Sequence, residues 1–538
     1  MAFSSRSRTL SRRQFLLRVA RFGGTAVLGS MFALDLLARD DRFHLKLEGR
    51  AGARRRVIIL GGGAAGLSSA YELGKLGYEC TILEARGRPG GRCWTVRRGT
   101  EETEIGNPKQ VCSFDEGQFY NAGPMRIPHH HTTTLGYCRE FGIPLTVFTN
   151  FNEAAYIVRK GYPKVRMREA LADLSGYTSE LLAKVMKQNL LDAPLTAEDR
   201  EKFIEYLRGE GRLNKDLIYP RSGDTSETPI QLDHSRGYTN SPGAVGGPGE
   251  PTVPLDLEAL VKAGYGTGFE FMKDYNQQPT MLTPVGGMDR IPYAFAQKLG
   301  SVIHYQCAVR EIRRTATGGV RITYTNGSRG DEVRQIAGDY CICALPPTLM
   351  REIPSDFSPA ALAALREAQP ASSGKIGLQF KRRFWEEDDD IYSGCSKTDD
   401  PIQQVYYPFD NYGSAGKGVI IGYYHFGEAE AEAMLDNRSP AERERVALEQ
   451  GARIHPQYPA EFENSFSVAW KRIPRNEGAW MVWKDTATYE DAQKVLRVAD
   501  GPFYFAGDWT SNATGWQAGA FVSAHRVCAQ IHQQSHAT

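Results

Sequence analysis

The sequence predicts a mixed α/β fold, α+β in part, on three observations. Residues 54–86 show a short apolar run rich in β-branched residues, a glycine turn, a helical pattern and a second strand-like run, in that order. Alternating runs typical of strands fill 302–346 and recur at 375–384 and 404–425. A charged, helix-forming region occupies 166–217. With 538 residues, 41% hydrophobic and 24% charged, the chain can form two or three domains with a large core.

The first 40 residues, 1–40, have the pattern of an export signal. Arg12 and Arg13 are followed by Phe15-Leu16-Leu17 and then by a modest apolar run at 22–34. This resembles the twin-arginine signal Ser-Arg-Arg-x-Phe-Leu-Lys, with Leu17 in place of lysine, and the run is too short for a stable membrane span. The alternative is a basic amphipathic helix of the mature protein. We therefore expect a periplasmic or secreted protein of the bacterial type, or a cytoplasmic one if the leader does not function.

Charge, cysteine spacing and the adjacent histidines argue against a nucleic-acid partner, structural disulfides and a metal site. The 65 basic and 63 acidic residues give a net charge of only +2, so we expect no nucleic-acid partner. Nine scattered cysteines without a C-x-x-C pair predict a fold that does not depend on disulfides. The adjacent histidines 129–131 have no supporting carboxylates nearby, so we interpret them as polar and structural and predict no metal site.

The glycine turn has the spacing of a dinucleotide-binding site. Gly61, Gly63 and Gly66 form G-x-G-x-x-G directly after the first strand and open the helix, and Glu84 ends the second strand 18 residues after Gly66. The glycines let the backbone approach a pyrophosphate, the helix N-terminus supplies amides and a partial positive charge, and the carboxylate can accept from ribose hydroxyls. A tight turn without a ligand is the alternative. We predict a Rossmann-like domain that binds NAD or FAD.

Further motifs between residues 55 and 530 resemble the flavin-dependent amine oxidase family and, within it, the L-amino-acid oxidases. In chain order they are "VIILGGGAAGLSSAY", "EARGRPGGRCWT", "GPMRIP", "PVGGMDRIPYAFA", "GKIGLQFKRRFWEED", "GVIIGYYHFG" and "FAGDWTSNATGWQAGA". The resemblance implies a Rossmann-like FAD-binding domain, a mixed-sheet substrate domain and a helical subdomain. Monoamine oxidases attach the flavin through a cysteine, but "RNEGAWMVW" has none at that place, so we expect non-covalent FAD.

The resemblance also implies discontinuous domains. The FAD-binding domain is expected at 54–105, 283–368 and 497–530, and the substrate-binding domain at 106–165 and 370–495. The helical subdomain is expected at 166–280. Its loop at 220–254 is rich in Pro, Gly and Ser, and we expect it to be exposed.

Carried over motif by motif, the resemblance implies a large set of FAD contacts. They are Gly61, Gly63, Ala64, Ala65, Gly66, Glu84, Ala85, Arg86, Gly91, Arg92, Gly123, Pro124, Met125, Arg126, Val309, Trp470, Gly507, Asp508, Gly515, Trp516, Gln517, Ala518, Gly519 and Ala520. The family often has Glu where Asp508 stands, and either carboxylate can bond a ribityl hydroxyl.

Arg126 raises a separate question, because a guanidinium flanked by apolar residues needs a partner anion. The resemblance implies that this anion is the substrate carboxylate, shared with the hydroxyl of Tyr423, while Gly515 and Trp516 lie beside the substrate amine. It also implies that Lys375 holds a water near flavin N5. The alternatives are an ion pair with an internal acid or the FAD pyrophosphate for Arg126, an ordinary strand aromatic for Tyr423, and a surface lysine for Lys375.

Together these features predict an FAD-dependent L-amino-acid oxidase. The resemblance implies hydride transfer from Cα to flavin N5 and release of a 2-oxo acid, ammonia and hydrogen peroxide, with an L-amino acid and oxygen as small-molecule partners and a possible homodimer. Trp480, Trp483 and Trp516 would suit apolar or aromatic side chains, although broad specificity stays open. The alternatives are an L-amino-acid 2-monooxygenase, a mono- or polyamine oxidase, and a FAD-binding protein without turnover.

Overall fold

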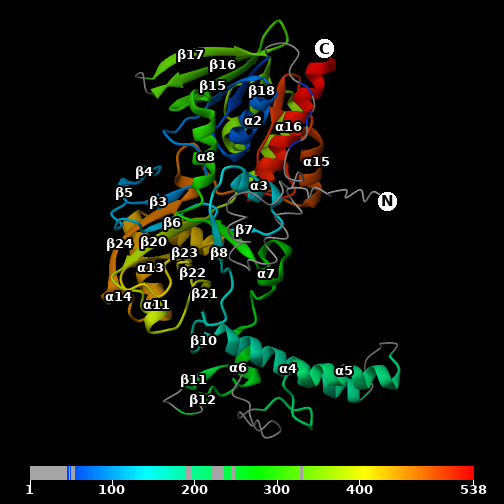
Figure 1. Ribbon diagram of the computed structural model, residues 1–538, viewed down its shortest axis with the longest axis vertical. Helices are drawn as coiled ribbons and strands as arrows, with labels where there is room; N and C mark the ends of the chain where they lie inside the picture. The colour runs from blue at the N-terminus through cyan, green and yellow to red at the C-terminus, as the bar shows by residue number, and fades with distance from the viewer. Residues whose placement is uncertain are drawn as a thin grey trace, which may run out of the picture.

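The computed structural model describes residues 45, 47, 49, 55–188, 195–220, 236–243, 247, 249–327 and 331–537. They form a parallel sheet with its helices, a mixed sheet with smaller sheets beside it, and a helical arm that projects at the bottom of Figure 1. The predicted mixed α/β class is confirmed. The leader at 1–40 and much of the loop at 220–254 lie outside the described residues, so export stays a prediction.

The parallel sheet has five strands in the order β14-β2-β1-β18-β26. Residues of β1 alternate between its faces: Val57 and Ile59 pack with α2, α8 and α16, whereas Ile58 and Leu60 pack with α10 and α15. Helices cover both faces, which explains why the strand is apolar and buried from Val57 to Leu60. The bounds are Arg56–Leu60 (β1), Glu79–Leu83 (β2), Ile303–His304 (β14), Tyr340–Cys343 (β18), Phe503–Phe505 (β26), Ala64–Lys75 (α2), Arg290–Leu299 (α8), Pro359–Glu367 (α10), Thr486–Leu496 (α15) and Gln517–Ala537 (α16).

The mixed sheet has seven strands in the order β10-β9-β21-β22-β23-β20-β24. Its pairs are antiparallel except β21 with β9. All seven residues of β20 are buried, because strands flank it on both sides and α13 packs nearby. The bounds are Tyr156–Val158 (β9), Val165–Arg166 (β10), Gly374–Phe380 (β20), Cys395–Thr398 (β21), Gln404–Tyr406 (β22), Gly418–Tyr424 (β23), Phe462–Ala469 (β24) and Pro440–Ile454 (α13).

Small sheets join these two layers. One three-stranded sheet has the order β7-β13-β8 and another the order β15-β16-β17, and the remaining strands form two-stranded ribbons. The bounds are Thr95–Arg97 (β3), Glu101–Thr103 (β4), Lys109–Val111 (β5), Phe119–Asn121 (β6), Ile127–Pro128 (β7), Leu145–Phe148 (β8), Tyr238–Asn240 (β11), Glu250–Pro251 (β12), Met281–Pro284 (β13), Cys307–Arg314 (β15), Val320–Asn326 (β16), Glu332–Gly338 (β17), Gln369–Pro370 (β19) and Met481–Val482 (β25).

Helices α4 (Met167–Lys187) and α5 (Ala197–Glu210) form the projecting arm (Figure 1). Thr196 caps α5 by accepting from the amide of Asp199 at 3.2 Å. The element contacts do not define where one domain ends and the next begins, so the predicted domain boundaries stay predictions. The other helices are Thr132–Glu140 (α3), Leu257–Ala263 (α6), Glu270–Lys273 (α7), Tyr275–Gln277 (η2), Gly300–Val302 (η3), Pro347–Met350 (α9), Phe384–Glu387 (α11), Ala429–Ala431 (α12), Glu432–Asp436 (η5), Tyr458–Glu461 (α14), Trp470–Arg472 (η6) and Asp508–Thr510 (η7).

In the part of the chain that the structure describes, no helix has both the length and the apolar character needed to cross a bilayer. Across the same residues, no three His, Cys, Asp or Glu side chains gather in a group suited to a metal ion.

A buried ion pair connects α13 to the turn between β4 and β5. Arg443 donates to both oxygens of Glu104 at 2.9 and 2.6 Å, and neither side chain is exposed to solvent. Glu104 also accepts from the amide of Ala469 at the end of β24. The bidentate geometry and this third bond compensate for the desolvation of both charges.

We expect Arg443→Met to lower the free energy of unfolding by about 3–5 kcal/mol, because it leaves the buried carboxylate of Glu104 without its cation. Denaturant or thermal unfolding of the purified protein measures the change. Arg445→Met is the control on the same helix: Arg445 is 70% exposed and pairs with Glu449 at 3.3 Å, so it should change stability by less than about 0.5 kcal/mol. Equal effects of the two substitutions would contradict the expectation.

Candidate active site

A cavity of about 400 Å³ lies where the chain leaves β1 and β18 and meets β20 of the mixed sheet. Ligands of parallel α/β sheets bind outside the carboxyl ends of the strands, and the volume is within the roughly 300–1,000 Å³ typical of ligand sites. Most of the predicted FAD contacts line this cavity. They are Gly61, Gly63, Ala64, Ala65, Glu84, Ala85, Arg86, Gly91, Arg92, Gly123, Pro124, Val309, Trp470, Gly507, Asp508, Gly515, Trp516, Gln517 and Ala520.

Five predicted contacts do not line the cavity: Gly66, Met125, Arg126, Ala518 and Gly519. Two of them are glycines that allow close packing within their own motifs. A Cβ at Gly66 would lie 2.0 Å from the carbonyl oxygen of Gly61, and one at Gly519 would lie 2.3 Å from that of Ala513. These glycines therefore shape the turns that support the cavity wall, and they are not part of the wall themselves.

The start of α2 is open for an anion. Gly61 adopts φ 101° and donates its amide to Leu83, which turns the chain sharply out of β1. Gly63 is the N-cap and provides no side chain to bond the first-turn amides, and a Cβ there would meet nothing within 4 Å. The open space and the amides of Ala64 and Ala65 fit a pyrophosphate.

The carboxylate of Glu84 is held at the end of β2. Its two oxygens accept from the amides of Gly62 and Arg86, both at 2.7 Å. A carboxylate has about four lone-pair positions, so Glu84 can still accept from a ribose hydroxyl.

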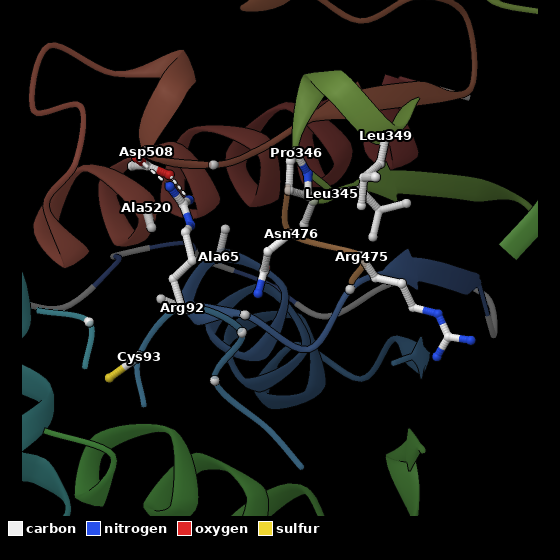
Figure 2. Close-up of a pocket in the computed structure, with 18 of the residues that line it drawn as sticks. Ala65, Arg92, Cys93, Leu345, Pro346, Leu349, Arg475, Asn476, Asp508 and Ala520 are labelled. Atoms are coloured by element: carbon white, nitrogen blue, oxygen red, sulfur yellow. Dashed lines mark hydrogen bonds and ion pairs between the residues drawn. The ribbon is translucent and has the colours of Figure 1, made fainter. Parts of the chain in front are cut away.

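Figure 2 shows a second carboxylate on the opposite wall, Asp508, bonded to the guanidinium of Arg92. Asp508 also accepts from the amide of Gly515 at 2.8 Å, and Arg92 donates to the carbonyl oxygen of Ala479 at 2.7 Å. These bonds connect the Gly90-Gly91-Arg92 motif to the C-terminal motif across the cavity.

Asn476 is a cavity residue that the sequence did not suggest. Figure 2 shows its amide pointing into the cavity, and the side chain is only 6% exposed. Its Nδ2 has no hydrogen-bond partner, whereas buried amides normally have one. Arg475 and Glu477 on either side have φ values of 63° and 50°, a left-handed backbone that fixes how Asn476 is presented. An unpaired buried donor fits a cofactor oxygen.

Lys375 of β20 lines the cavity where it meets the mixed sheet, and the side chain is almost fully buried. Its Nζ donates to the carbonyl oxygens of Asn121 at 3.2 Å and Gly123 at 2.5 Å. Burial, with a smaller effect of the charge of Arg126, lowers the pKa of Lys375 well below its usual value. Sδ of Met125, 3.6 Å from Nζ, is a weaker third contact. When the amine is neutral, its two hydrogens bond the two carbonyls and its lone pair can accept from a water.

The structure corrects one predicted residue, because Tyr424 and not Tyr423 lines the cavity. In the antiparallel pair of β20 and β23, Lys375 lies opposite Tyr424 and Ile376 lies opposite Tyr423. Opposed residues share a face and successive residues alternate, so only one of the two tyrosines can face the same side as Lys375. The ring of Tyr424 lies 4.3 Å from Nζ of Lys375, whereas Tyr423 packs in the core of the mixed sheet.

Arg126 lies just behind the cavity wall, with 7% of its surface exposed. Its Nη1 donates to the hydroxyl of Tyr406 at 3.4 Å, and its guanidinium lies 5.9 Å from the ring centres of both Tyr406 and Trp516. Its Nε has no partner, and no described carboxylate forms an ion pair with it. The structure therefore gives Arg126 no internal acid.

The remaining predicted residues divide between the cavity and the core. Trp480 and Trp516 line the cavity, whereas Trp483 does not and packs against Tyr489. His131 is buried, and its ring contacts that of Trp516 edge-on at 4.9 Å.

The fold and this cavity define a protein that binds a dinucleotide next to a buried lysine and a buried arginine. The profile of the family described as flavin containing amine oxidoreductase matches residues 64–532, and the chain belongs to that family. FAD is therefore its cofactor, and the protein is a flavin-dependent oxidoreductase of the amine oxidase type.

Two curated relatives carry the name L-amino-acid oxidase. The chain is 26% identical to a putative L-amino-acid oxidase, YobN, of Bacillus subtilis (strain 168), over 93% of this chain and all of that one. It is 29% identical to an L-amino-acid oxidase of Pseudechis australis, over 86% and 84% of the two chains.

Among solved structures, putrescine oxidase bound to putrescine matches with a TM-score of 0.59 at 18% identity, over 89% of this chain and 99% of that one. Cyclohexylamine oxidase from Brevibacterium oxydans IH-35A matches with a TM-score of 0.57 at 17% identity, over 90% and 99% of the two chains. At these identities the structures share the fold, and they do not define the substrate.

We expect Asn476→Ala to weaken FAD binding about 5- to 20-fold, because it removes the unpaired donor, which corresponds to about 1–2 kcal/mol. Release of flavin fluorescence on dilution measures this without turnover. Asn437→Ala is the control at an exposed asparagine and should retain FAD like the wild type. Acid precipitation of the wild type should leave all the flavin in the supernatant, as expected for a non-covalent cofactor. Retention by Asn476→Ala equal to that of the control would exclude the donor role.

The lowered pKa of Lys375 predicts a pH-dependent stability difference between the wild type and Lys375→Met. In the unfolded chain the lysine has a pKa near 10.4, so between the two values unfolding takes up a proton and stability rises with pH. Methionine has no such titration. The wild type should therefore gain stability relative to Lys375→Met as the pH rises towards about 10, in thermal unfolding of the FAD-loaded proteins. A constant difference would show that Lys375 is charged in the folded protein.

Proposed function

We propose that the protein is an L-amino-acid oxidase. The observation that carries this proposal is the buried guanidinium of Arg126, which lacks an acidic partner among the described residues and lies beside Lys375, Tyr424 and Trp516. A planar guanidinium binds a carboxylate through two parallel hydrogen bonds, and an amine substrate without a carboxylate would leave that charge unpaired. The names of the curated relatives support the same substrate class.

In the proposed site, Arg126 holds the substrate α-carboxylate and Tyr424 contributes a hydroxyl on the same side. The ring of Trp516 and the backbone of Gly515 flank the amino group, which reacts as the neutral amine. Lys375 holds a water by accepting from it, since its own hydrogens are bonded to Asn121 and Gly123. Bound FAD supplies the two-electron oxidation and the reaction with oxygen that gives hydrogen peroxide. The imino acid then hydrolyses to a 2-oxo acid and ammonia.

The cavity residues that would contact FAD, here called the dinucleotide wall, determine where that chemistry takes place. Gly63, Ala64 and Ala65 would hold the pyrophosphate, Glu84 a ribose, and Asp508 a ribityl hydroxyl. Trp480 and Trp516 on the substrate side favour apolar or aromatic side chains.

Anaerobic flavin bleaching against L-amino acids, D-amino acids and the corresponding decarboxylated amines tests the proposal. Bleaching by L-amino acids, with the 2-oxo acid and hydrogen peroxide as aerobic products, is expected. Amines oxidised as fast as their amino acids would favour an amine oxidase, an amide product would favour a 2-monooxygenase, and a flavin that nothing bleaches would favour a binding protein.

We expect Arg126→Met to keep the FAD spectrum and to raise KM for L-amino acids about 100-fold, because about 3 kcal/mol of charge-assisted hydrogen bonding is lost. The Arg126→Met variant should oxidise the corresponding decarboxylated amine at least as fast as the wild type does. Steady-state kinetics with both substrates make the comparison. Unchanged KM values would return Arg126 to a structural role.

A further inference from the structure

One short turn, η2, follows α7 and is connected by hydrogen bonds to side chains near Arg126. Two consecutive residues of this turn, Asn276 and Gln277, are partners of buried side chains on either side of Arg126. The turn leads into β13 after three residues, and no motif or predicted residue of the sequence falls on it.

The first connection runs from Gln277 to Arg126. Gln277 accepts from Nδ2 of Asn150 at 3.2 Å, and Oδ1 of Asn150 accepts from the hydroxyl of Tyr406 at 3.3 Å. The same hydroxyl accepts from Nη1 of Arg126 at 3.4 Å. All four side chains are less than 9% exposed, so water does not compete for these bonds.

Strand pairing explains why these distant residues meet. β8 and β13 are antiparallel, with Phe148 opposite Met281, so the chain that leaves β8 runs beside the chain that enters β13. This places Asn150 next to Gln277. Tyr406 at the end of β22 then has its hydroxyl between Asn150 and Arg126.

The second connection runs from Asn276 to Trp516. Oδ1 of Asn276 lies 3.2 Å from Nε2 of His131 and 2.9 Å from Nε2 of His130. An amide oxygen only accepts, so both imidazoles carry their hydrogen on Nε2. The ring of His131 contacts the ring of Trp516 edge-on, and Trp516 in turn lies beside Arg126.

These connections matter because Arg126 has little else to hold it. Among the described residues, its guanidinium has one hydrogen-bond partner, the hydroxyl of Tyr406. A flexible guanidinium must be ordered before it can hold a carboxylate at two points. A hydroxyl that is itself bonded to Asn150 is a fixed acceptor, whereas a freely rotating hydroxyl is not.

We propose that η2 is a positioning element for substrate recognition. Gln277, acting through Asn150 and Tyr406, orients Arg126 for the substrate carboxylate, and Asn276, acting through His131, holds the ring of Trp516. The inference rests on the proposed function, because it assigns the carboxylate to Arg126. The turn η2 therefore determines how tightly a carboxylate is bound, although it does not touch the substrate.

The test compares Gln277→Ala with Gln278→Ala in the FAD-loaded enzyme. Gln278 is the next residue and takes no part in either connection, so it is a matched control. Gln277→Ala should raise KM for an L-amino acid, and Kd for benzoate measured by flavin absorbance, about 5- to 10-fold, with kcat within twofold. Oxidation of the amine without a carboxylate should not change. Gln277→Glu keeps an acceptor for Asn150 and should restore KM to near the wild-type value.

A role in folding alone would lower Tm and affect the amino acid and the amine equally, and that result would overturn the proposal. If Gln277→Ala does not fold, Asn150→Asp replaces it: the acceptor for Tyr406 remains, the donor to Gln277 is lost, and the same rise in KM is expected. A wild-type KM in that variant would also overturn the proposal.

Arg126→Met measured in parallel separates the two levels of inference. If Arg126→Met is impaired for amino acids and Gln277→Ala matches Gln278→Ala, the positioning role is wrong and the proposed function stands. If Arg126→Met is itself unchanged for amino acids, the proposed function fails and the positioning role fails with it.

Discussion

The substrate side of this protein depends on one uncompensated charge, the buried guanidinium of Arg126. Removing a cation from water without a counter-charge is costly, and among the described residues a hydroxyl and two aromatic faces offset the cost. The neighbouring amine of Lys375 responds to the same charge, because both its burial and Arg126 lower its pKa. In the proposed site the two basic groups therefore do different work: the guanidinium of Arg126 binds an anion, and the amine of Lys375 bonds a water.

The register of β20 against β23 determines which groups share that environment. It places Lys375 and Tyr424 towards the cavity, and Ile376 and Tyr423 towards the core of the mixed sheet. Adjacent tyrosines are indistinguishable in the sequence, and a shift of one residue exchanges their faces. This explains why resemblance alone indicated Tyr423. The motif lies on β23, but which of its residues face the cavity depends on pairing with another strand about fifty residues away in the chain.

The same distinction separates what the sequence predicted from what it missed. The glycine turn and Glu84 were predictable because their spacing follows from one local unit, and that unit lines the cavity as expected. Asn476 was not, because its meaning depends on an unpaired amide that only the folded cavity reveals. Tyr406 and Asn150 were missed for a related reason: each is an ordinary polar residue until the sheets bring it within hydrogen-bond distance of a partner more than a hundred residues away.

The cavity also shows how two independently built layers form one site. The dinucleotide wall belongs to the parallel sheet, while Lys375 and Tyr424 belong to the mixed sheet, and the bonds from Arg92 to Asp508 and Ala479 cross between segments far apart in the chain. Those bonds hold the dinucleotide wall in place whether or not a substrate is bound. Arg126 is held differently, through side chains that end on η2. In the proposed site, cofactor retention and carboxylate affinity would therefore depend on separate sets of contacts, and substitutions around Arg126 would alter substrate binding without loss of the cofactor.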